Sequence, residues 1–225
     1  MKSLTLMAVA FVCAGPAMAT NVVVNGDFSA GNTGFTSGLT LTTMTPHLFQ
    51  NAVHGIYAVE LIGNVAGSSA YGDWTNVTTD PFGANTNVFV ADGPDHAPAP
   101  VAWSETVAVM PGTSYTFSFY GAEISNACCS NASLLPAING TALAPLNLNG
   151  SWQQASFVWN SGAATSAVLS ITDTNTSGGF NDFVMTDIAL TSATAAVPEP
   201  QTLGLMLAGL VAIGGINRRR SSRMH

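Results

Sequence analysis

Alternation of apolar and polar side chains at every second residue is the feature that most constrains this chain. Phe117 and Phe119 share one face of a short run, and Phe157 and Trp159 share one face of a later run. A period of two is the signature of a half-buried β-strand, and residues 20–196 show no convincing helical period. The chain is therefore predicted to be all-β.

Turn residues separate the predicted strands at short intervals. Met110-Pro111-Gly112 and Asn139-Gly140 have the chemistry of tight connections between antiparallel strands. Residues 20–196 suffice for one such domain, so we predict a single antiparallel β-sandwich, a jelly roll. We expect Val107, Phe117, Phe119, Phe157 and Trp159 in its core. The predicted strands are 22–24, 39–43, 57–62, 88–90, 103–109, 115–120, 152–159, 167–172 and 183–191.

The first 19 residues have the three parts of a secretory signal peptide. Lys2 supplies a positive start, residues 4–14 are apolar, and Ala17-Met18-Ala19 forms an A-x-A cleavage site. Cleavage is expected before Thr20. The domain that follows is therefore predicted to be exported.

Charge in the exported part is one-sided. Residues 20–197 contain no Lys or Arg and eleven Asp and Glu residues. A domain with a charge of about −11 repels phosphate backbones and anionic lipid surfaces, so nucleic acid is excluded as a partner. The cysteines of this part, Cys128 and Cys129, are adjacent and cannot cross-link distant strands. They form a vicinal disulfide, stay reduced, or pair between molecules.

The end of the chain combines a rigid motif, an apolar run and a basic stop. Pro198-Glu199-Pro200 precedes an uncharged helix predicted at about residues 202–217, and Arg218-Arg219-Arg220 follow. The arginines hold the C-terminus on the cytoplasmic side of a membrane. The apolar run of residues 203–216 is shorter than the roughly 20 residues of a stable span. We expect a transient membrane anchor.

This tail, residues 197–225, resembles the PEP-CTERM sorting domain of Gram-negative bacteria. The resemblance implies recognition by an exosortase in the inner membrane, which acts as a protease or transpeptidase. It also implies removal of the tail and release to the cell surface or to the extracellular polysaccharide matrix. The alternative is an ordinary tail anchor.

Four pieces of the exported part, in order, resemble the galactose-binding-like jelly rolls of carbohydrate-binding modules. The resemblance implies polysaccharide binding and a structural calcium ion, held by a Glu after the first Phe and by an Asp of a closing Asp-Asp pair. Here Ser29 and Thr186 occupy two of these positions. Asp187 is left as the acidic calcium ligand, and no other cofactor is expected. The four pieces are residues 24–28, 109–117, 150–157 and 181–188.

The segment 63–100 is the predicted place for ligand binding, because it is long and rich in Gly, Asn and Asp. Tyr71 and Trp74 are expected to stack on sugar rings, and Asp73 and Asn76 to bond sugar hydroxyls. The alternative for Trp74 is that it covers one end of the core.

Catalysis has weaker support in the sequence. Glu60, Glu105 and Glu123 are candidates for the paired carboxylates of a glycoside hydrolase, but nothing in the sequence brings two of them together. No G-x-S-x-G motif is present. The histidines that could act as bases before the tail are His47, His54 and His96.

We therefore expect a non-catalytic protein of the cell surface or extracellular matrix that binds polysaccharide. Two alternatives stay open. One is a purely structural matrix or floc protein without a ligand pocket, and the other is a secreted glycoside hydrolase.

Overall fold

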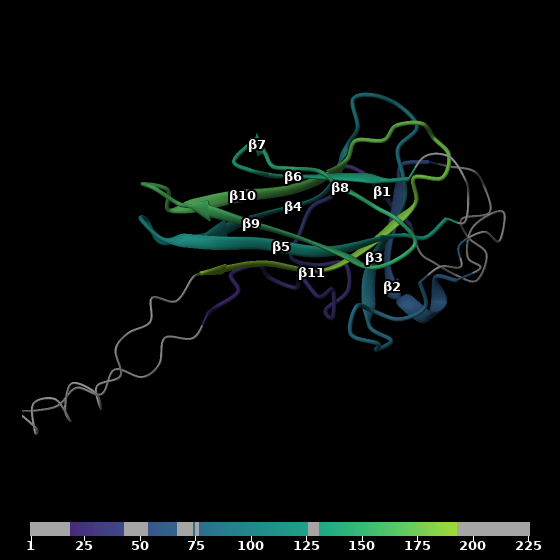
Figure 1. Cartoon of the computed structure of the whole chain (residues 1–225), viewed down its shortest axis with the longest axis horizontal. Helices are drawn as coiled ribbons and strands as arrows, with labels where there is room; N and C mark the ends of the chain where they lie inside the picture. The colour runs from purple at the N-terminus through teal and green to yellow at the C-terminus, as the bar shows by residue number, and fades with distance from the viewer. Residues whose placement is uncertain (1–18, 43–53, 67–73, 75–76, 126–130, 193–225) are drawn as a thin grey trace, which may run out of the picture. The chain divides into compact units, whose positions relative to one another are not determined.

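The computed structural model describes residues 19–42, 54–66, 74, 77–125 and 131–192. Two β-sheets pack face to face in this part of the chain (Figure 1), and Thr20–Ala193 form one compact unit. The helical structure among the described residues is one short 3-10 turn, Ile62–Asn64. The prediction of an all-β jelly-roll sandwich is confirmed.

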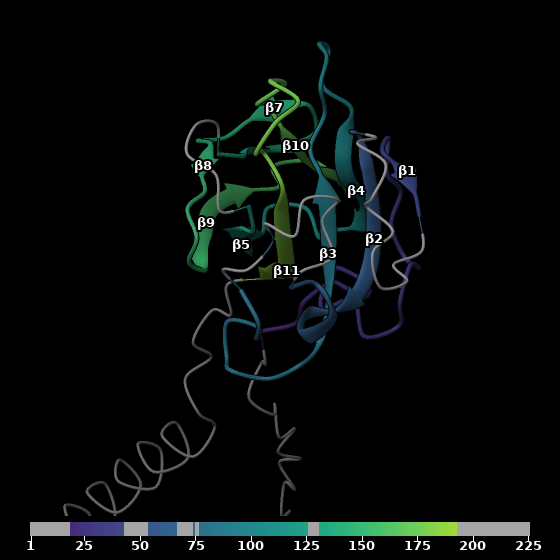
Figure 2. The ribbon, with the colours of Figure 1, turned by 90° about the vertical axis from the view of Figure 1, so that its right-hand side faces the viewer.

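The larger sheet has six strands in the order β1-β2-β3-β11-β5-β9. Its neighbours are antiparallel, except that the short β1 pairs in parallel with β2. Figure 2, a view along the long axis, shows β2, β3 and β11 side by side. The strands are β1 Thr40–Leu41, β2 Ile56–Leu61, β3 Asn87–Asp92, β5 Ser114–Glu123, β9 Gln153–Asn160 and β11 Phe183–Ser192.

The smaller sheet has the order β4-β10-β6-β7, and β8 also pairs with β6. In Figure 1 its strands β6 and β10 form the upper layer, above β5 and β11 of the larger sheet. The strands are β4 Val101–Ala108, β6 Ser133–Ile138, β7 Thr141–Ala142, β8 Leu146–Asn147 and β10 Ser166–Asp173.

The core between the sheets contains most of the predicted side chains. Val107, Phe117 and Phe119 are buried as expected. Phe157 and Trp159 pack against the core but are only half-buried. Both lie on β9, which is an edge strand of the larger sheet. An inward side chain at an edge has neighbours on one side only, so the prediction of full burial was wrong for these two.

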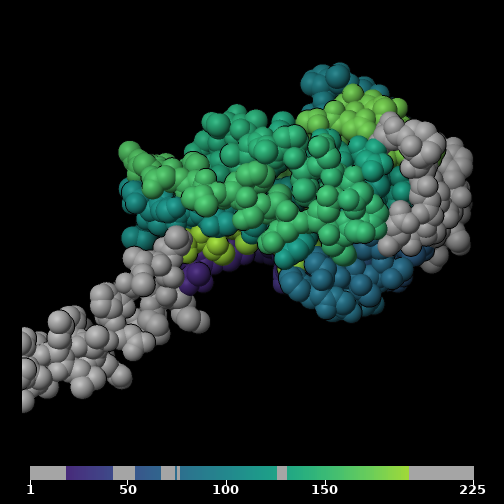
Figure 3. All heavy atoms as spheres, in the orientation of Figure 1, coloured from purple at the N-terminus to yellow at the C-terminus, as the bar shows by residue number. Residues whose placement is uncertain are grey.

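A second apolar cluster lies on the outer face of the larger sheet. Three described residues that precede β3, Ile62, Trp74 and Val77, pack there against Val88 of β3. In Figure 3 the atoms of this part of the chain, in blue, protrude from the lower side of the domain. Ala122 of β5 and Val184 of β11 belong to the same buried cluster, so described parts of the segment predicted to be a ligand loop instead cover apolar side chains of the sheet.

The predicted strands differ from the structure in several places, and the short strands β7 and β8 were not predicted. Residues 22–24 form no strand, although Val22 N–H donates to the Leu190 carbonyl oxygen at 3.0 Å. Strand β6 was not predicted, because Pro136 has no N–H to donate and Leu135 breaks the alternation. The Asn139-Gly140 turn after β6 is confirmed: both residues have positive φ, 51° and 75°, as a type I′ hairpin turn requires.

The N-terminal segment lies against the last strand. Ile188 N–H donates to the Gly26 carbonyl oxygen at 2.9 Å, and Asn21 forms an antiparallel bridge with Thr191. A Cβ atom at Gly26 would overlap the Ile188 carbonyl oxygen. Glycine is therefore required where the two segments approach.

Candidate functional site

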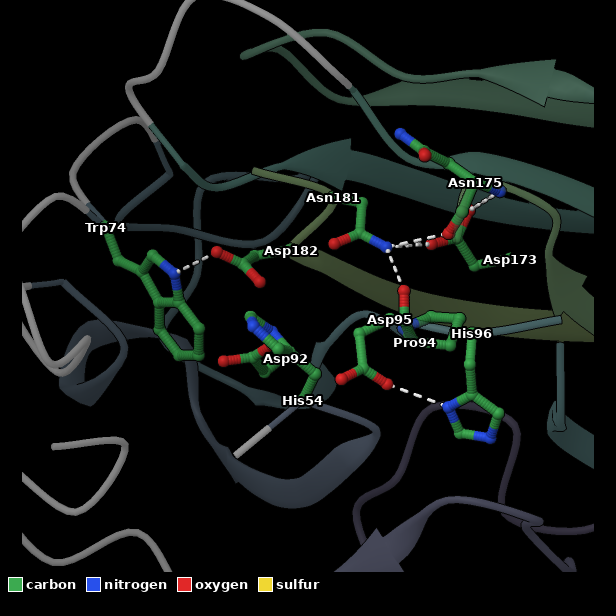
Figure 4. A network of polar contacts seen from close by, with 10 residues as sticks. All are labelled: His54, Trp74, Asp92, Pro94, Asp95, His96, Asp173, Asn175, Asn181 and Asp182. Carbon is green, nitrogen blue, oxygen red and sulfur yellow. Dashed lines mark hydrogen bonds and ion pairs between the residues drawn. The ribbon is translucent and has the colours of Figure 1, made fainter. Parts of the chain in front are cut away.

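A network of polar side chains lies at the end of the sandwich where β3 ends and β11 begins (Figure 4). Within it, Trp74 Nε1–H donates to Asp182 Oδ2 at 2.8 Å. Trp74 is only 1% exposed, so it cannot be the predicted stacking platform. The alternative interpretation holds, since its ring packs inward and its N–H bonds an internal carboxylate. The other predicted ligand residues, Tyr71, Asp73 and Asn76, lie outside the described residues.

Asn181 is the centre of this network. Its Nδ2 lies 3.1 Å from Asp173 Oδ2, 3.1 Å from the Pro94 carbonyl oxygen and 2.7 Å from the Asn175 carbonyl oxygen. The side chain is fully buried, and its Oδ1 has no hydrogen-bond partner among the described residues. Asn181 therefore joins two loops to the start of β11.

The buried carboxyls of this network favour their protonated forms. Burial, together with the charges of Asp92 and Glu123, raises the pKa of Asp182 to about 8. Burial raises the pKa of Glu123 to about 7, although hydrogen bonds from Ala132 and Ser125 oppose the shift. Burial also raises the pKa of Asp173 to about 6. Near neutral pH, Asp182 is therefore largely uncharged inside the domain.

The predicted bases are bound to aspartates. His54 Nδ1 lies 2.8 Å from Asp92 Oδ1, and the exposed His96 Nδ1 lies 2.7 Å from Asp95 Oδ1. Figure 4 shows both pairs at the same end of the domain. His47 lies outside the described residues.

The three glutamates proposed as catalytic candidates have separate surroundings. Glu105 faces inward from β4, accepts a hydrogen bond from Val24 N–H at 2.9 Å, and has a pKa raised by burial. Glu123 bonds Ser125 and Ala132. Glu60, on β2, accepts from Asn64 Nδ2 at 2.9 Å. No hydrogen bond between any two of these glutamates is seen in the described part of the chain.

A second polar site opens on the outer face of the larger sheet, beside the segment 62–86. It is a hollow of about 350 Å³, a size at the lower end of typical small-molecule sites. We call it the Phe82 hollow. Its lining residues are Asp27, Ser29, Leu61, Asp80, Phe82, Thr86, Asn87, Thr186 and Asp187.

A β-bulge in β11 places two consecutive side chains in the Phe82 hollow. The pairing with β5 shifts between Thr186 and Ala189, and Asp187 has a φ of 53°. Met185 and Ile188 both face the core, so Thr186 and Asp187 between them both face outward. Thr186 is 2% exposed, and neither its hydroxyl nor the Asp187 carboxylate has a hydrogen-bond partner among the described residues. These two groups on the floor of the hollow can therefore still form hydrogen bonds.

Phe82 is displayed on a rigid turn at the rim of the hollow. Asp80 Oδ1 accepts from Phe82 N–H at 2.9 Å and Ala84 N–H at 2.8 Å, and Asp80 Oδ2 accepts from Thr86 Oγ1 at 2.8 Å. Burial opposes ionisation of Asp80, but these hydrogen bonds together outweigh it and lower the pKa. The Phe82 ring is 71% exposed and stands edge-to-face against Tyr120, with centroids 5.6 Å apart. An apolar ring is therefore held in solvent beside polar groups.

The predicted calcium ligand, Asp187, lies in this hollow. Burial raises its pKa, and the charges of Asp80 and Asp27 raise it further. In the ranges that the structure describes, no three Asp, Glu, His or Cys side chains are placed to hold a metal ion. Because Ser29 and Thr186 stand at two of the expected acidic positions, the residues present do not fit the calcium site that the resemblance implies.

Phe82 was not predicted as a site residue, and Thr186 was considered only as a replacement for a calcium ligand. The signal for Phe82 was the run Asp80-Pro81-Phe82-Gly83, in which an aromatic residue stands between turn-forming residues. Thr186 gave no signal, since only the bulge turns it outward next to Asp187.

The predicted export residues lie mostly outside the described part. Of the cleavage site, Ala19 and Thr20 are described and exposed, and Ala17 is not described. Pro198-Glu199-Pro200, the predicted helix at about 202–217 and Arg218-Arg219-Arg220 are outside the described residues. Among the residues that are described, no helix is both long and apolar enough to cross a membrane.

Comparison with solved structures gives similarity in fold. The Stig cyclase FisC from Fischerella sp. TAU, solved with (3Z)-3-(1-methyl-2-pyrrolidinylidene)-3H-indole, is 13% identical over 79% of this chain and 100% of its own, with a TM-score of 0.55. An apo cyclase from Fischerella sp. is 12% identical over 80% of this chain and 98% of its own, with a TM-score of 0.53. A family 16 carbohydrate-binding module is 16% identical over 76% of this chain and 99% of its own, with a TM-score of 0.44.

Sequence comparison gives a more specific result for the tail alone. A search of curated proteins gives no match. Residues 196–221 match the family model described as the PEP-CTERM protein-sorting motif. The chain is thus an exported protein that joins a jelly-roll β-sandwich to a C-terminal PEP-CTERM sorting motif.

Proposed function

We propose that this domain binds extracellular polysaccharide without catalysing a reaction, and that sugar rings dock in the Phe82 hollow. The observation that carries the proposal is an aromatic ring, 71% exposed, held beside a hydroxyl and a carboxylate that bond no other residue in the described part of the chain. The C–H faces of a sugar suit an aromatic plane, while its hydroxyls need hydrogen-bond partners. Phe82 takes the role that the sequence had suggested for Tyr71 and Trp74.

The sorting motif supports delivery of the domain to a place where polysaccharide is present. We propose that an exosortase-type enzyme recognises Pro198-Glu199-Pro200 while residues 202–217 hold the chain transiently in the inner membrane. Removal of the tail then leaves the sandwich at the cell surface or in the extracellular matrix.

A glycan array followed by calorimetric titration tests the binding proposal. The wild type should give saturable, sugar-specific signals, and Phe82→Ala should weaken binding by about tenfold, or about 1.4 kcal/mol. Met110→Ala is the matched control, because Met110 is equally exposed at 71% on the turn after β4. Absence of saturable binding to any glycan would instead favour a purely structural matrix protein.

One observation favours a second candidate, a secreted glycoside hydrolase. Glu123 and Asp182 hold protons near neutral pH, as a general acid must. Both are nearly buried and accept hydrogen bonds from the domain itself, which favours a structural role. Polysaccharide turnover by the wild type that is lost in Glu123→Gln would establish the hydrolase.

A further inference from the structure

We infer that the Phe82 hollow selects sugars that carry a protonated amine, so that the ligand is a polysaccharide with free hexosamine units. This inference rests on the proposed function and names the ligand class for the same site. It distinguishes an amine-bearing polymer from neutral polymers and from polymers of uronic acids.

The carboxylates around the hollow differ in the hydrogen bonds that they accept. Asp80 uses both of its oxygens within its own turn, and Asp27 Oδ1 accepts from Ser29 N–H and Oγ. Asp187 has no such bond in the described part of the chain, and it is half-buried. The charges of Asp80 and Asp27 add to burial in raising its pKa. A neutral hydroxyl can bond this carboxylate, but only a cation also offsets the crowded negative charge.

In its described part, the exported domain has no basic side chain placed to neutralise these carboxylates. Residues 20–197 contain no Lys or Arg, and both described histidines are bound to aspartates at the opposite end of β3. The described acids form no group of three that could hold a metal ion. A cationic group on a ligand would supply the compensating charge that these side chains do not.

The floor of the hollow offers acceptors that suit an ammonium group. Such a group has three donors, and the Asp187 carboxylate and the Thr186 hydroxyl are adjacent acceptors that bond no other described residue. The rest of the sugar ring can lie on Phe82, whose face also attracts a cation. Uronic acids and sulfated sugars would meet like charge here and across the whole domain.

Calorimetric titration with three matched hexamers tests the inference on the full chain in mild detergent. The probes are the hexamer of β-1,4-linked glucosamine, its N-acetylated form, and cellohexaose. The titrations are carried out at about pH 6, where the amino groups of the glucosamine hexamer are protonated. EDTA is present throughout. We expect the glucosamine hexamer to bind at least about tenfold more tightly than the other two, or about 1.4 kcal/mol.

Variants separate the amine contact from sugar binding as such. Asp187→Asn should bring the three affinities to within about twofold of one another while neutral sugars still bind, a difference of about 0.4 kcal/mol. Asn tolerates the positive φ of Asp187, so the fold should survive. Asp95→Asn, an exposed carboxyl at the other end of β3, is the control and should keep the full preference. If Asp187→Asn does not fold, Asp27→Asn on the rim should reduce the same preference.

The possible results distinguish the two proposals. If no hexamer binds, the proposed function fails together with the inference. If all three bind equally and Phe82→Ala weakens all of them, the proposed function stands and the amine preference is refuted. If binding appears only when CaCl₂ replaces EDTA, the carboxylates serve a metal ion and the inference is overturned.

Discussion

Asp182→Asn should make the domain more stable at alkaline pH. Asp182 is 8% exposed and accepts a hydrogen bond from Trp74. Asparagine has nearly the same shape, so its Oδ1 can keep that bond, and its neutral NH₂ group removes the charge that Asp92 and Glu123 repel. The variant thus imitates the protonated acid at every pH.

The sign of the pH effect follows from the two pKa values. The pKa of Asp182 is about 8 in the folded domain against an ordinary value of 3.8. The folded state therefore holds the proton more tightly than the unfolded state between these values. The proton on Asp182 makes its full contribution to the free energy of unfolding below about pH 4. This contribution is lost progressively as the pH rises and is gone above about pH 8.

The magnitude has a ceiling and a smaller expected value. A shift of about four units corresponds to about 6 kcal/mol at about 1.4 kcal/mol per unit. Part of this reflects the charges of Asp92 and Glu123, and entry of water reduces the penalty further. We expect the variant to exceed the wild type by about 2 kcal/mol above pH 8. For a domain of this size that is a rise in Tm of roughly 4 to 8 °C.

Thermal unfolding at about pH 5 and pH 9 checks this prediction. The wild type should lose stability between the two, and the variant should lose less while matching the wild type at the lower pH. A residual loss should remain, because the pKa values of Glu123 and Asp173 are also raised. Asp95→Asn, at an exposed site, should follow the wild type. Parallel curves for Asp182→Asn and wild type would refute the assignment of a protonated Asp182.

Two further predictions concern the core and the tail. Phe117→Ala should cost about 3 to 5 kcal/mol in urea unfolding, whereas Phe157→Ala, its half-buried cross-strand partner, should cost about 1 to 3; equal costs would contradict the edge-strand explanation. Changing Pro198-Glu199-Pro200 to three alanines should leave membrane insertion intact but trap the full-length chain in the inner membrane; a variant that reaches the surface in the wild-type trimmed form, by fractionation and mass spectrometry, would disprove the sorting role.

The period of two predicted the sandwich because it reports directly which side chains can share a face. It located the central strands, such as β5 with Phe117 and Phe119, to within a few residues. It could not tell that β9 is an edge strand, since strand order depends on pairings between distant segments. It also passed over β6, where Pro136 reads as a strand breaker although its carbonyl accepts from Leu143 N–H.

The sites depended on contacts that no local pattern contains. Trp74 read as a surface aromatic because its neighbours are loop-forming residues, yet its partner Asp182 is 108 residues away in sequence. The Phe82 hollow combines Asp27 from the first segment, the turn at residues 80–86 and Asp187 from the last strand. Each piece alone is an ordinary loop or strand end, so the combination appears only after folding.

The same arrangement couples the ligand site to the two ends of the domain. Asn21 Oδ1 accepts from Leu190 N–H at 3.0 Å, and Val22 N–H donates to the Leu190 carbonyl oxygen. These bonds hold the first segment, with Asp27, against the strand that carries Asp187. Since β11 is the last strand before the sorting tail, the hollow can be completed only after nearly the whole domain has been exported.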